Sequence, residues 1–411
     1  MSTDEKVLGM PATSGRWLFV VLGLIMNVCL GAVYAYSIFL KPVRDAFAGI
    51  SAFQANLPFM VFLAFFAVLM FFGGRLMEKT GPRKMGIIGG VIVGLGWLLS
   101  SFAPNIWALT LTYGVIAGSG VGLVYGCPVS MGAKWFPDKK GLAVGLMLAG
   151  FGGSALITGK LASVLIPSVG LPTTFAYFGI AFGIILVILS LPFRFPAAGW
   201  APSGWKPAAG SVAAADFTPG EMAKTGTFWG LFLCFLIGSI AGLMAIGISK
   251  PAGNEIIKIS GETAATLVGV FAIFNALGRP LFGFLTDKIT PRNAAILNLV
   301  IILIVSLIMI IAREGDTGLY TISFIGFWLC LGGWLAIAPT ATATFFGMKN
   351  YARNYGVVFC SYGLGAIVGG IISGQAKDVF GTYTVAFYPT AVLAVVGLVL
   401  TVALLKTPKK A

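Results

Sequence analysis

The stretch AATLVGVFAIFNALGRPLFGFLTDKITPRN, residues 264–293, decides the fold of this chain. Its apolar part is about 20 residues long, which is enough for one helix to cross a lipid bilayer. Arg279 lies inside that apolar part. An arginine near the centre of a spanning helix costs at least about 2.5 kcal/mol on insertion scales, so such residues usually face a polar cavity. The stretch therefore predicts a membrane protein with an intramembrane cation on a substrate or ion path.

Asn275 precedes Arg279 by four residues, so a helix places both side chains on one face. An arginine can hold both oxygens of a carboxylate, and an asparagine amide can add a further donor. In the alternative interpretation, Arg279 pairs with a structural carboxylate of the bundle, but no other apolar stretch offers an obvious one. We therefore expect Arg279 and Asn275 to bind an anionic substrate.

The composition supports a membrane protein throughout, because 58% of the 411 residues are hydrophobic and 10% are charged. Twelve apolar stretches are long enough to span a bilayer, and one polar stretch rich in Pro, Gly, Ala and Ser separates the sixth from the seventh. The expected fold is an all-α membrane protein with twelve transmembrane helices in two six-helix bundles. The expected division is an N-terminal bundle over 1–193, a cytoplasmic linker over 194–224 and a C-terminal bundle over 225–411.

The net charge of +14 does not indicate nucleic-acid binding, because Lys and Arg form no basic stripe with interleaved aromatics. These residues fall in short loops between apolar stretches, where they indicate the orientation of the chain in the membrane. With both termini in the cytoplasm, 19 of the 27 Lys and Arg residues lie on that side, 7 lie outside and Arg279 lies in the membrane. The positive-inside rule favours this orientation. All five cysteines lie in apolar stretches, so we expect no disulfides.

An internal repeat relates the two halves. Five positions match at a constant offset of 209, namely Gly74 with Gly283, Glu78 with Asp287, Lys79 with Lys288, Pro82 with Pro291 and Arg83 with Arg292. Each copy follows the second helix of its half, and Thr290 stands in the second copy where a glycine is expected. Acids and bases at such a turn can form a charge network that breaks as the halves move, so Glu78 and Asp287 are candidate gating residues.

With these motifs the chain resembles the major facilitator superfamily, whose signature G-x-x-x-D-R-x-G-R-R is matched by GRLMEKTGPRK. Residues 135–153, WFPDKKGLAVGLMLAGFGG, resemble the start of the fifth helix in the monocarboxylate porter family. Small residues at Gly145, Ala149, Gly150 and Gly153 predict close approach of a neighbouring helix.

The resemblance implies that an arginine followed by a proline in the eighth helix binds the carboxylate, and Arg279 with Pro280 matches that pair. Asn275 stands where the animal lactate carriers have an aspartate, and residues 357–370 lack the lysine of the oxalate exchanger. A single cation favours a monoanion, because a second buried carboxylate would be unpaired. The start SGRW, residues 14–17, looks more like the bacterial oxalate and formate exchangers of the same family.

Five aromatic residues are further candidates for the wall of the substrate cavity. Tyr34 and Tyr125 lie among small residues, where a ring can project into space and offer a hydroxyl. Trp334 and Tyr362 are weaker candidates for the same wall, and Phe151 is expected to close it from the fifth helix. For Tyr34 and Tyr125, a packed or interfacial aromatic is an equal alternative.

The resemblance also implies that a proton accompanies the anion, although the chain has no histidine. Two routes remain open: coupling centred on Arg279 and the substrate, which we favour, or titration at an outer cluster of Lys377 with Asp378 and Glu262. Lys377 is therefore a candidate coupling residue.

The sequence thus predicts a proton-coupled secondary transporter of small monocarboxylates such as L-lactate and pyruvate, in the bacterial cytoplasmic (inner) membrane. The alternatives are a formate/oxalate-type anion exchanger and a non-transporting receptor on the same fold. Its expected partners are the monocarboxylate anion, the proton and the lipid bilayer, with no nucleic acid and no obligatory protein partner, so a monomer is expected. Without a metal-ligand cluster or Walker loop, we expect no enzyme activity, no catalytic residues, no cofactor and no metal site.

Overall fold

A computed structural model describes residues 6–7, 9–197, 200–202, 216–347 and 349–408 of the chain. The first half contains α1 (Ala12–Leu30), the 3₁₀-helix η1 (Gly31–Ala35), α2 (Tyr36–Ala46), α3 (Ala52–Ser100), α4 (Ile106–Leu109), the π-helical segment η2 (Thr110–Ala117), α5 (Gly118–Trp135), α6 (Lys140–Val169) and α7 (Leu171–Ser190). The second half contains α8 (Pro219–Ala223), α9 (Gly226–Glu255), α10 (Gly261–Ile311), α11 (Thr317–Phe346), α12 (Tyr351–Phe380), the 3₁₀-helix η3 (Tyr383–Ala386) and α13 (Phe387–Leu404). A two-residue antiparallel pair, β1 (Lys6–Val7) with β2 (Met10–Pro11), precedes α1.

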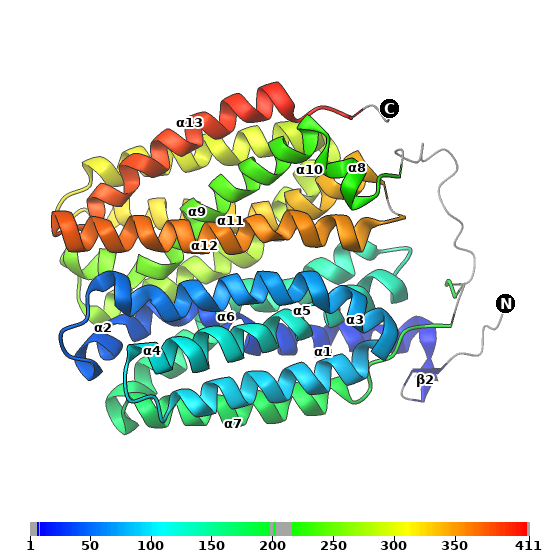
Figure 1. The fold of residues 1–411 in the computed structure, drawn as a ribbon, viewed down its shortest axis with the longest axis horizontal. Helices are drawn as coiled ribbons and strands as arrows, with labels where there is room; N and C mark the ends of the chain where they lie inside the picture. The colour runs from blue at the N-terminus through cyan, green and yellow to red at the C-terminus, as the bar shows by residue number, and fades with distance from the viewer. Residues whose placement is uncertain (1–5, 8, 198–199, 203–215, 348, 409–411) are drawn as a thin grey trace.

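The helices form two bundles that lie side by side, one built from α1 to α7 and the other from α9 to α13 (Figure 1). The short β1–β2 pair, α8 and the end of α13 lie at one end of the molecule, which we call the terminal end (Figure 1). The opposite end, where α2 ends and α3 begins, is called the far end. This arrangement confirms the expected all-α fold.

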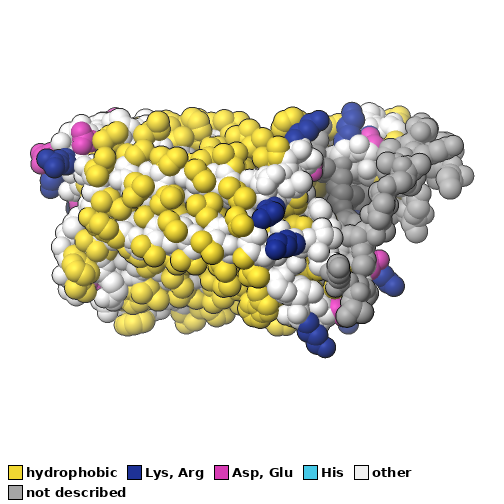
Figure 2. All heavy atoms as spheres, turned by 90° about the horizontal axis from the view of Figure 1, so that it is seen from above, with side chains coloured by type: hydrophobic (Ala, Val, Ile, Leu, Met, Phe, Trp, Pro, Cys, Tyr) yellow, Lys and Arg dark blue, Asp and Glu magenta, His cyan; other side chains and the backbone are white. Residues whose placement is uncertain are grey.

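On the face that Figure 2 shows, an apolar band lies between the two ends of the molecule, and Lys, Arg, Asp and Glu gather at the ends. Large hydrophobic side chains are exposed along this band, as at Phe72, Ile184 and Val399. In water such a surface would be strongly unfavourable, but it matches the hydrocarbon core of a bilayer. The chain is a multi-pass membrane protein.

Eleven helices in the described part of the chain are long and apolar enough to cross a membrane. One of them, α10, has 51 residues, so a straight helix of its length would extend about 75 Å, more than twice the thickness of a bilayer core. The backbone leaves the helical conformation at Thr290, with φ 77° and ψ 154°. Two spans therefore meet at Thr290, and the chain crosses the membrane twelve times.

The corresponding break in α3 occurs at Gly81, with φ 80° and ψ 161°. Gly81 and Thr290 are separated by the offset of the sequence repeat, and their backbone conformations are nearly the same. Glycine adopts this region without strain, whereas a β-branched residue is strained there. The second copy therefore keeps the turn although it has lost the glycine.

The two bundles meet along α3 with α12 and along α6 with α10. At the far end, the carboxylate of Asp378 accepts the backbone N–H groups of Ala52 (2.8 Å) and Phe53 (3.0 Å) at the start of α3. Ser51 caps the same helix, and Gln54 completes a capping box. We propose that the bundles comprise 1–193 and 225–411, joined by 194–224; residues 198–199 and 203–215 of that linker lie outside the described residues.

Candidate anion-binding site

Arg279 lies in the first span of α10 with only 3% of its surface exposed. None of its three guanidinium nitrogens has a hydrogen-bond partner among the described residues. The ion pairs of the described chain do not include it either. A buried cation without a partner is expensive, so the side chain is suited to receive an anion from outside the protein.

Aromatic rings of the first bundle lie beside the guanidinium. The ring centre of Phe151 on α6 lies 5.7 Å from Cζ of Arg279. Tyr34 and Tyr125 each meet Phe151 edge to face, with centroid distances of 5.1 and 5.4 Å. Tyr125 also interacts electrostatically with Arg279, although the guanidinium makes no hydrogen bond of acceptable geometry with it in the described structure. The arrangement is an apolar wall with phenol hydroxyls beside one cation, which suits a small carboxylate.

The hydroxyl groups of Tyr34 and Tyr362 are 2.7 Å apart and form a hydrogen bond between the two bundles. Tyr34 belongs to η1, where the first span changes from α-helical to 3₁₀ geometry. A 3₁₀ segment inside a helix often marks a functional hinge. Gly31 allows this segment to approach α6, because a Cβ at Gly31 would collide with the backbone at Phe151.

The structure therefore brings together Arg279, Tyr34, Tyr125, Phe151 and Tyr362, which come from α10, η1, α5, α6 and α12.

Asn275 lies one turn before Arg279, but its amide Nδ2 donates to the carbonyl of Trp328 on α11 (2.8 Å). Gly332 packs directly against the backbone of Asn275, so α10 and α11 cross closely here. One amide donor is thus used to hold these helices together. The side-chain oxygen Oδ1 of Asn275 has no hydrogen-bond partner among the described residues, and it is an acceptor rather than a donor. Asn275 therefore has one side-chain N–H left with which it could donate to an anion, as the sequence predicts.

Trp334 reaches the aromatic wall through Phe235. Its ring stacks on Phe235 of α9 at 5.9 Å, and Phe235 in turn lies 6.4 Å from Tyr362. Gly238 leaves the space that the indole fills. In this conformation Trp334 supports the wall from behind.

The sequence analysis missed an aromatic stripe on α12. Tyr351, Tyr355, Phe359 and Tyr362 recur every three or four residues, and each ring contacts the next at centroid distances of 6.0, 5.7 and 4.9 Å. Tyr355 interacts electrostatically with both Arg279 and Tyr125. The helical spacing of these four rings is visible in the sequence. The predicted wall rested instead mainly on single aromatics among small residues, which does not select a stripe.

The two candidate gating residues, Glu78 and Asp287, lie at the two copies of the sequence repeat. Asp287 is exposed at the terminal end and takes part in none of the ion pairs of the described residues. The side chain of Glu78 lies outside the described part of the structure. The expected charge network at the two repeat copies stays a prediction.

The expected outer cluster of Lys377, Asp378 and Glu262 needs correction. Lys377 pairs with Glu255, which precedes the loop between α9 and α10. Asp378 instead caps α3, and Glu262 lines a separate cavity. Neighbouring positions on a helix point in different directions, so Lys377 and Asp378 reach different partners.

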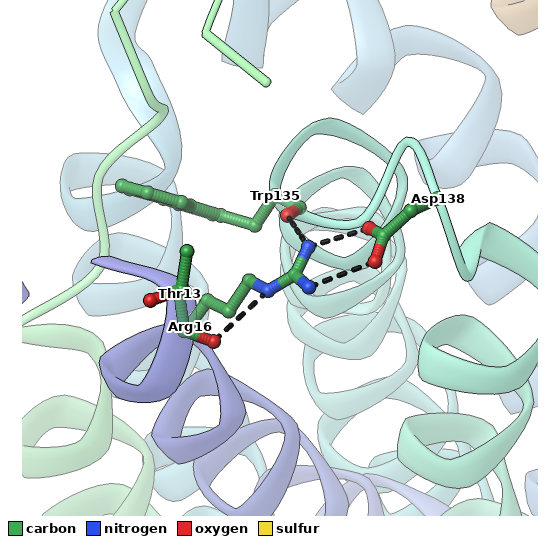
Figure 3. Close-up of polar contacts among 4 residues, drawn as sticks. All are labelled: Thr13, Arg16, Trp135 and Asp138. Atoms are coloured by element: carbon green, nitrogen blue, oxygen red, sulfur yellow. Dashed lines mark hydrogen bonds and ion pairs between the residues drawn. The ribbon is translucent and has the colours of Figure 1, made fainter. Parts of the chain in front are cut away.

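A polar cluster at the terminal end fixes the motif WFPDKK to the first helix (Figure 3). Arg16 donates to both carboxylate oxygens of Asp138 (2.5 and 2.8 Å) and to the carbonyl of Trp135 (3.0 Å). Its Nε donates to the carbonyl of Thr13 (3.3 Å), and its guanidinium lies over Phe136. Arg16 holds the pKa of Asp138 below its ordinary value through these hydrogen bonds. Unlike Arg279, this arginine is satisfied by the protein itself.

Two six-helix bundles that enclose a buried cation, unpaired within the part of the chain that the structure describes, define a membrane transporter rather than an enzyme. The chain matches the sequence model of the Major Facilitator Superfamily over residues 20–338 and 241–411, and it belongs to that superfamily.

Its relatives include the oxalate:formate antiporter of Oxalobacter formigenes, which is 30% identical over 387 residues, covering 94% of this chain and 90% of that one. Monocarboxylate transporter 13 of Rattus norvegicus is 26% identical over 332 residues, covering 79% and 74%. These matches confirm the resemblance to monocarboxylate carriers. Among solved structures, the inward-facing, unoccupied bacterial homologue of the human lysosomal transporter Spinster superposes with a TM-score of 0.71 at 17% identity, covering 94% of this chain and 95% of that one. That likeness shows the shared fold.

Proposed function

We propose that this transporter carries small monocarboxylates such as L-lactate and pyruvate, and that Arg279 binds the carboxylate. The observation that carries the proposal is the buried guanidinium, whose three nitrogens have no hydrogen-bond partner among the described residues, beside Tyr34, Tyr125 and Phe151. A planar guanidinium fork matches a carboxylate in two parallel hydrogen bonds. The aromatic wall would accommodate a short apolar tail.

A monoanion fits the charge at the site better than a dianion. Arg279 is the one Lys or Arg side chain that the described ring and electrostatic contacts place at this aromatic wall. A second carboxylate bound there would have no cation of its own, and burying it would be costly.

A second candidate is exchange of formate with oxalate, as the printed name of the antiporter from Oxalobacter formigenes describes for that protein. It is favoured by the 30% identity that extends over 94% of this chain. Uptake of labelled L-lactate, formate and oxalate into proteoliposomes separates the two functions. Transport of oxalate against formate without transport of L-lactate would replace the first proposal by the second.

Proton coupling is proposed to depend on Arg279 and the substrate. Arginine stays protonated, so the proton would cross on the substrate itself: the anion would bind at Arg279, take up a proton that enters from the same side, and leave as the acid. The alternative carrier, Lys377, is ion-paired with Glu255 on α9, and an opposite charge favours the ionised form of a lysine.

We propose that the terminal end faces the cytoplasm of a bacterium and that the protein works as a monomer in the inner membrane. The support is the excess of Lys and Arg in the loops of the terminal end, as counted from the sequence. The far end, with Asp378 at the start of α3, would then face outward.

The first prediction tests the carboxylate site through Arg279→Lys. Lysine keeps the charge but cannot reproduce the planar fork, so L-lactate uptake should fall at least about tenfold, which corresponds to the loss of one charged hydrogen bond. Arg313→Lys is the matched control, because Arg313 is exposed in the loop after α10. Uptake by Arg279→Lys at the parent rate would show that the site is elsewhere.

The second prediction concerns coupling. An inward-directed proton gradient should drive L-lactate accumulation in proteoliposomes, and Lys377→Ala should retain that response because its ion pair lies within one bundle. Intravesicular pH is measured together with uptake. Electrogenic L-lactate entry without a pH change, or a Lys377→Ala variant that transports but ignores the gradient, would reject coupling through the substrate.

A further inference from the structure

A cavity of about 350 Å³ lies at the far end, away from Arg279. Lys160 and Ser163 of α6 line it from the first bundle, and Lys250 of α9 with Glu262 and Thr266 of α10 line it from the second. The cavity therefore lies between the two bundles. Its volume is sufficient for a carboxylate of a few carbon atoms together with water.

The lining carries more positive than negative charge. Neither Lys160 nor Lys250 forms an ion pair among the described residues, and Glu262 does not pair with either of them. Lys41 lies within electrostatic range of Lys250 but is itself ion-paired with Asp45. Two ammonium groups with hydroxyls nearby form a site for a small anion.

The cavity is separated from Arg279 along α10. Glu262 and Arg279 are 17 positions apart in this helix, which corresponds to about 25 Å. Between them α6 and α10 pack closely, with Leu156 against Gly269 and Gly152 against Asn275. An anion in the cavity could not contact Arg279, so the two positions are distinct sites at the two ends of one helix interface.

We propose that this cavity is an outer capture site that binds small carboxylates before they reach Arg279. The proposal rests on the proposed function for the substrate class and for the outward direction of the far end. Two lysines at a cleft raise the local concentration of anions and their rate of entry. Because the lysines belong to different bundles, a bound carboxylate also reduces their mutual repulsion when the far end is closed.

Binding at the cavity is tested without transport, in purified Arg279→Ala protein. Lysines are labelled with an amine-reactive reagent at constant ionic strength, in chloride or with L-lactate, formate or oxalate, and each site is quantified by mass spectrometry. The carboxylates should slow labelling of Lys160 and Lys250 several-fold relative to Lys258, an exposed lysine that does not line the cavity. Equal labelling in all salts would overturn the proposal, and so would protection that is found in the parent protein but is absent from Arg279→Ala.

Directional kinetics provide the second test. In oriented proteoliposomes, the Lys160→Gln, Lys250→Gln double variant should raise KM for uptake from the far-end side several-fold and leave KM from the terminal-end side unchanged. Arg313→Gln, an exposed cation at the same end, should change neither value. An equal rise in KM from both sides would mean that the two lysines affect the balance between conformations, and it would reject the proposed capture site. If the parent carries no carboxylate at all, the proposed function fails, while the labelling experiment still decides the cavity.

Discussion

At the scale of single residues, two buried arginines have opposite roles because their surroundings differ. The guanidinium of Arg16 donates hydrogen bonds to Asp138, Trp135 and Thr13. The guanidinium nitrogens of Arg279 have no hydrogen-bond partner among the described groups. Replacing Asp138 would leave the Arg16 charge uncompensated, and such a loss is costly for a buried cation. Arg16 therefore stabilises the fold, while Arg279 is available to a ligand.

The Arg16 contact predicts a pH-dependent stability. The folded pKa of Asp138 is lowered, first by its hydrogen bond with Arg16. Its contribution is therefore complete above the pKa of the unfolded carboxyl, about 4, and is lost as pH falls through the lower folded value. Asp138→Asn should lower the unfolding temperature in detergent by about 2 °C at pH 7, and the difference from the parent should shrink on acidification.

Asp45→Asn is the control for that experiment, because Lys41 and Asp45 form an ion pair with highly exposed side chains. Exposed pairs contribute little to stability, so this variant should match the parent at both pH values. A constant difference between Asp138→Asn and the parent across the acid range would contradict a role for the Asp138 charge.

The residue types decided how much of the site could be predicted. Arg279 can be proposed from the sequence because a charge in a spanning helix needs a physical reason, and Tyr34 because small neighbours leave room for a ring. Their roles in binding stay predictions. The partner of Lys377 was not predictable, since only the direction of the side chain selects Glu255. Asn275 shows the same limit: its spacing gives its face, but the choice of the Trp328 carbonyl depends on how closely α11 approaches.

At the scale of elements, the sequence repeat predicted the position of the two tight turns. Thr290 shows that the two copies share a backbone conformation even where the residue differs. The glycine was lost, but the positive φ was kept, with 77° at Thr290 and 80° at Gly81. The turn geometry is therefore fixed by the packing of the two spans and not by the residue at its centre. A strained threonine in this region costs about 1–3 kcal/mol.

Thr290→Gly should therefore stabilise the protein. The gain is the relieved strain minus about 0.5–1 kcal/mol for the extra freedom of glycine in the unfolded chain, so a net gain of about 1 kcal/mol is expected. Thr290 is exposed, and its side chain makes no hydrogen bond in the described structure that would be lost. Thermal unfolding in detergent measures the change.

Thr80→Gly is the opposite control, because Thr80 precedes the first turn within α3 and its hydroxyl bonds the carbonyl of Leu76 (3.0 Å). This variant should be less stable than the parent, since glycine inside a helix is unfavourable. If Thr290→Gly is destabilised as much as Thr80→Gly, the backbone at Thr290 is not strained.

At the scale of the whole molecule, the bundles are held together by few polar contacts. Among the described residues, hydrogen bonds cross between the bundles at Tyr34 with Tyr362 and at Asp378 with the start of α3. The Asp378 contact lies at the far end, whereas the Arg16 cluster at the terminal end stays within one bundle. Few crossing contacts are compatible with bundles that move relative to one another, because little must be broken.

Asp378→Ala should shift the conformational balance towards an open far end. The variant removes two charge-assisted hydrogen bonds that join the bundles, each worth about 1.5–3 kcal/mol in general, so the closed state should lose at least about tenfold in relative population. Glu255→Gln is the matched control, because its ion pair with Lys377 lies at the same end but within one bundle. Spin labels on Ser168→Cys and Glu314→Cys, exposed positions at the far end of different bundles, report the distance between the bundles. Asp378→Ala should add a longer distance to the distribution and Glu255→Gln should not. If both variants keep the parent distribution, Asp378 does not hold the far end closed.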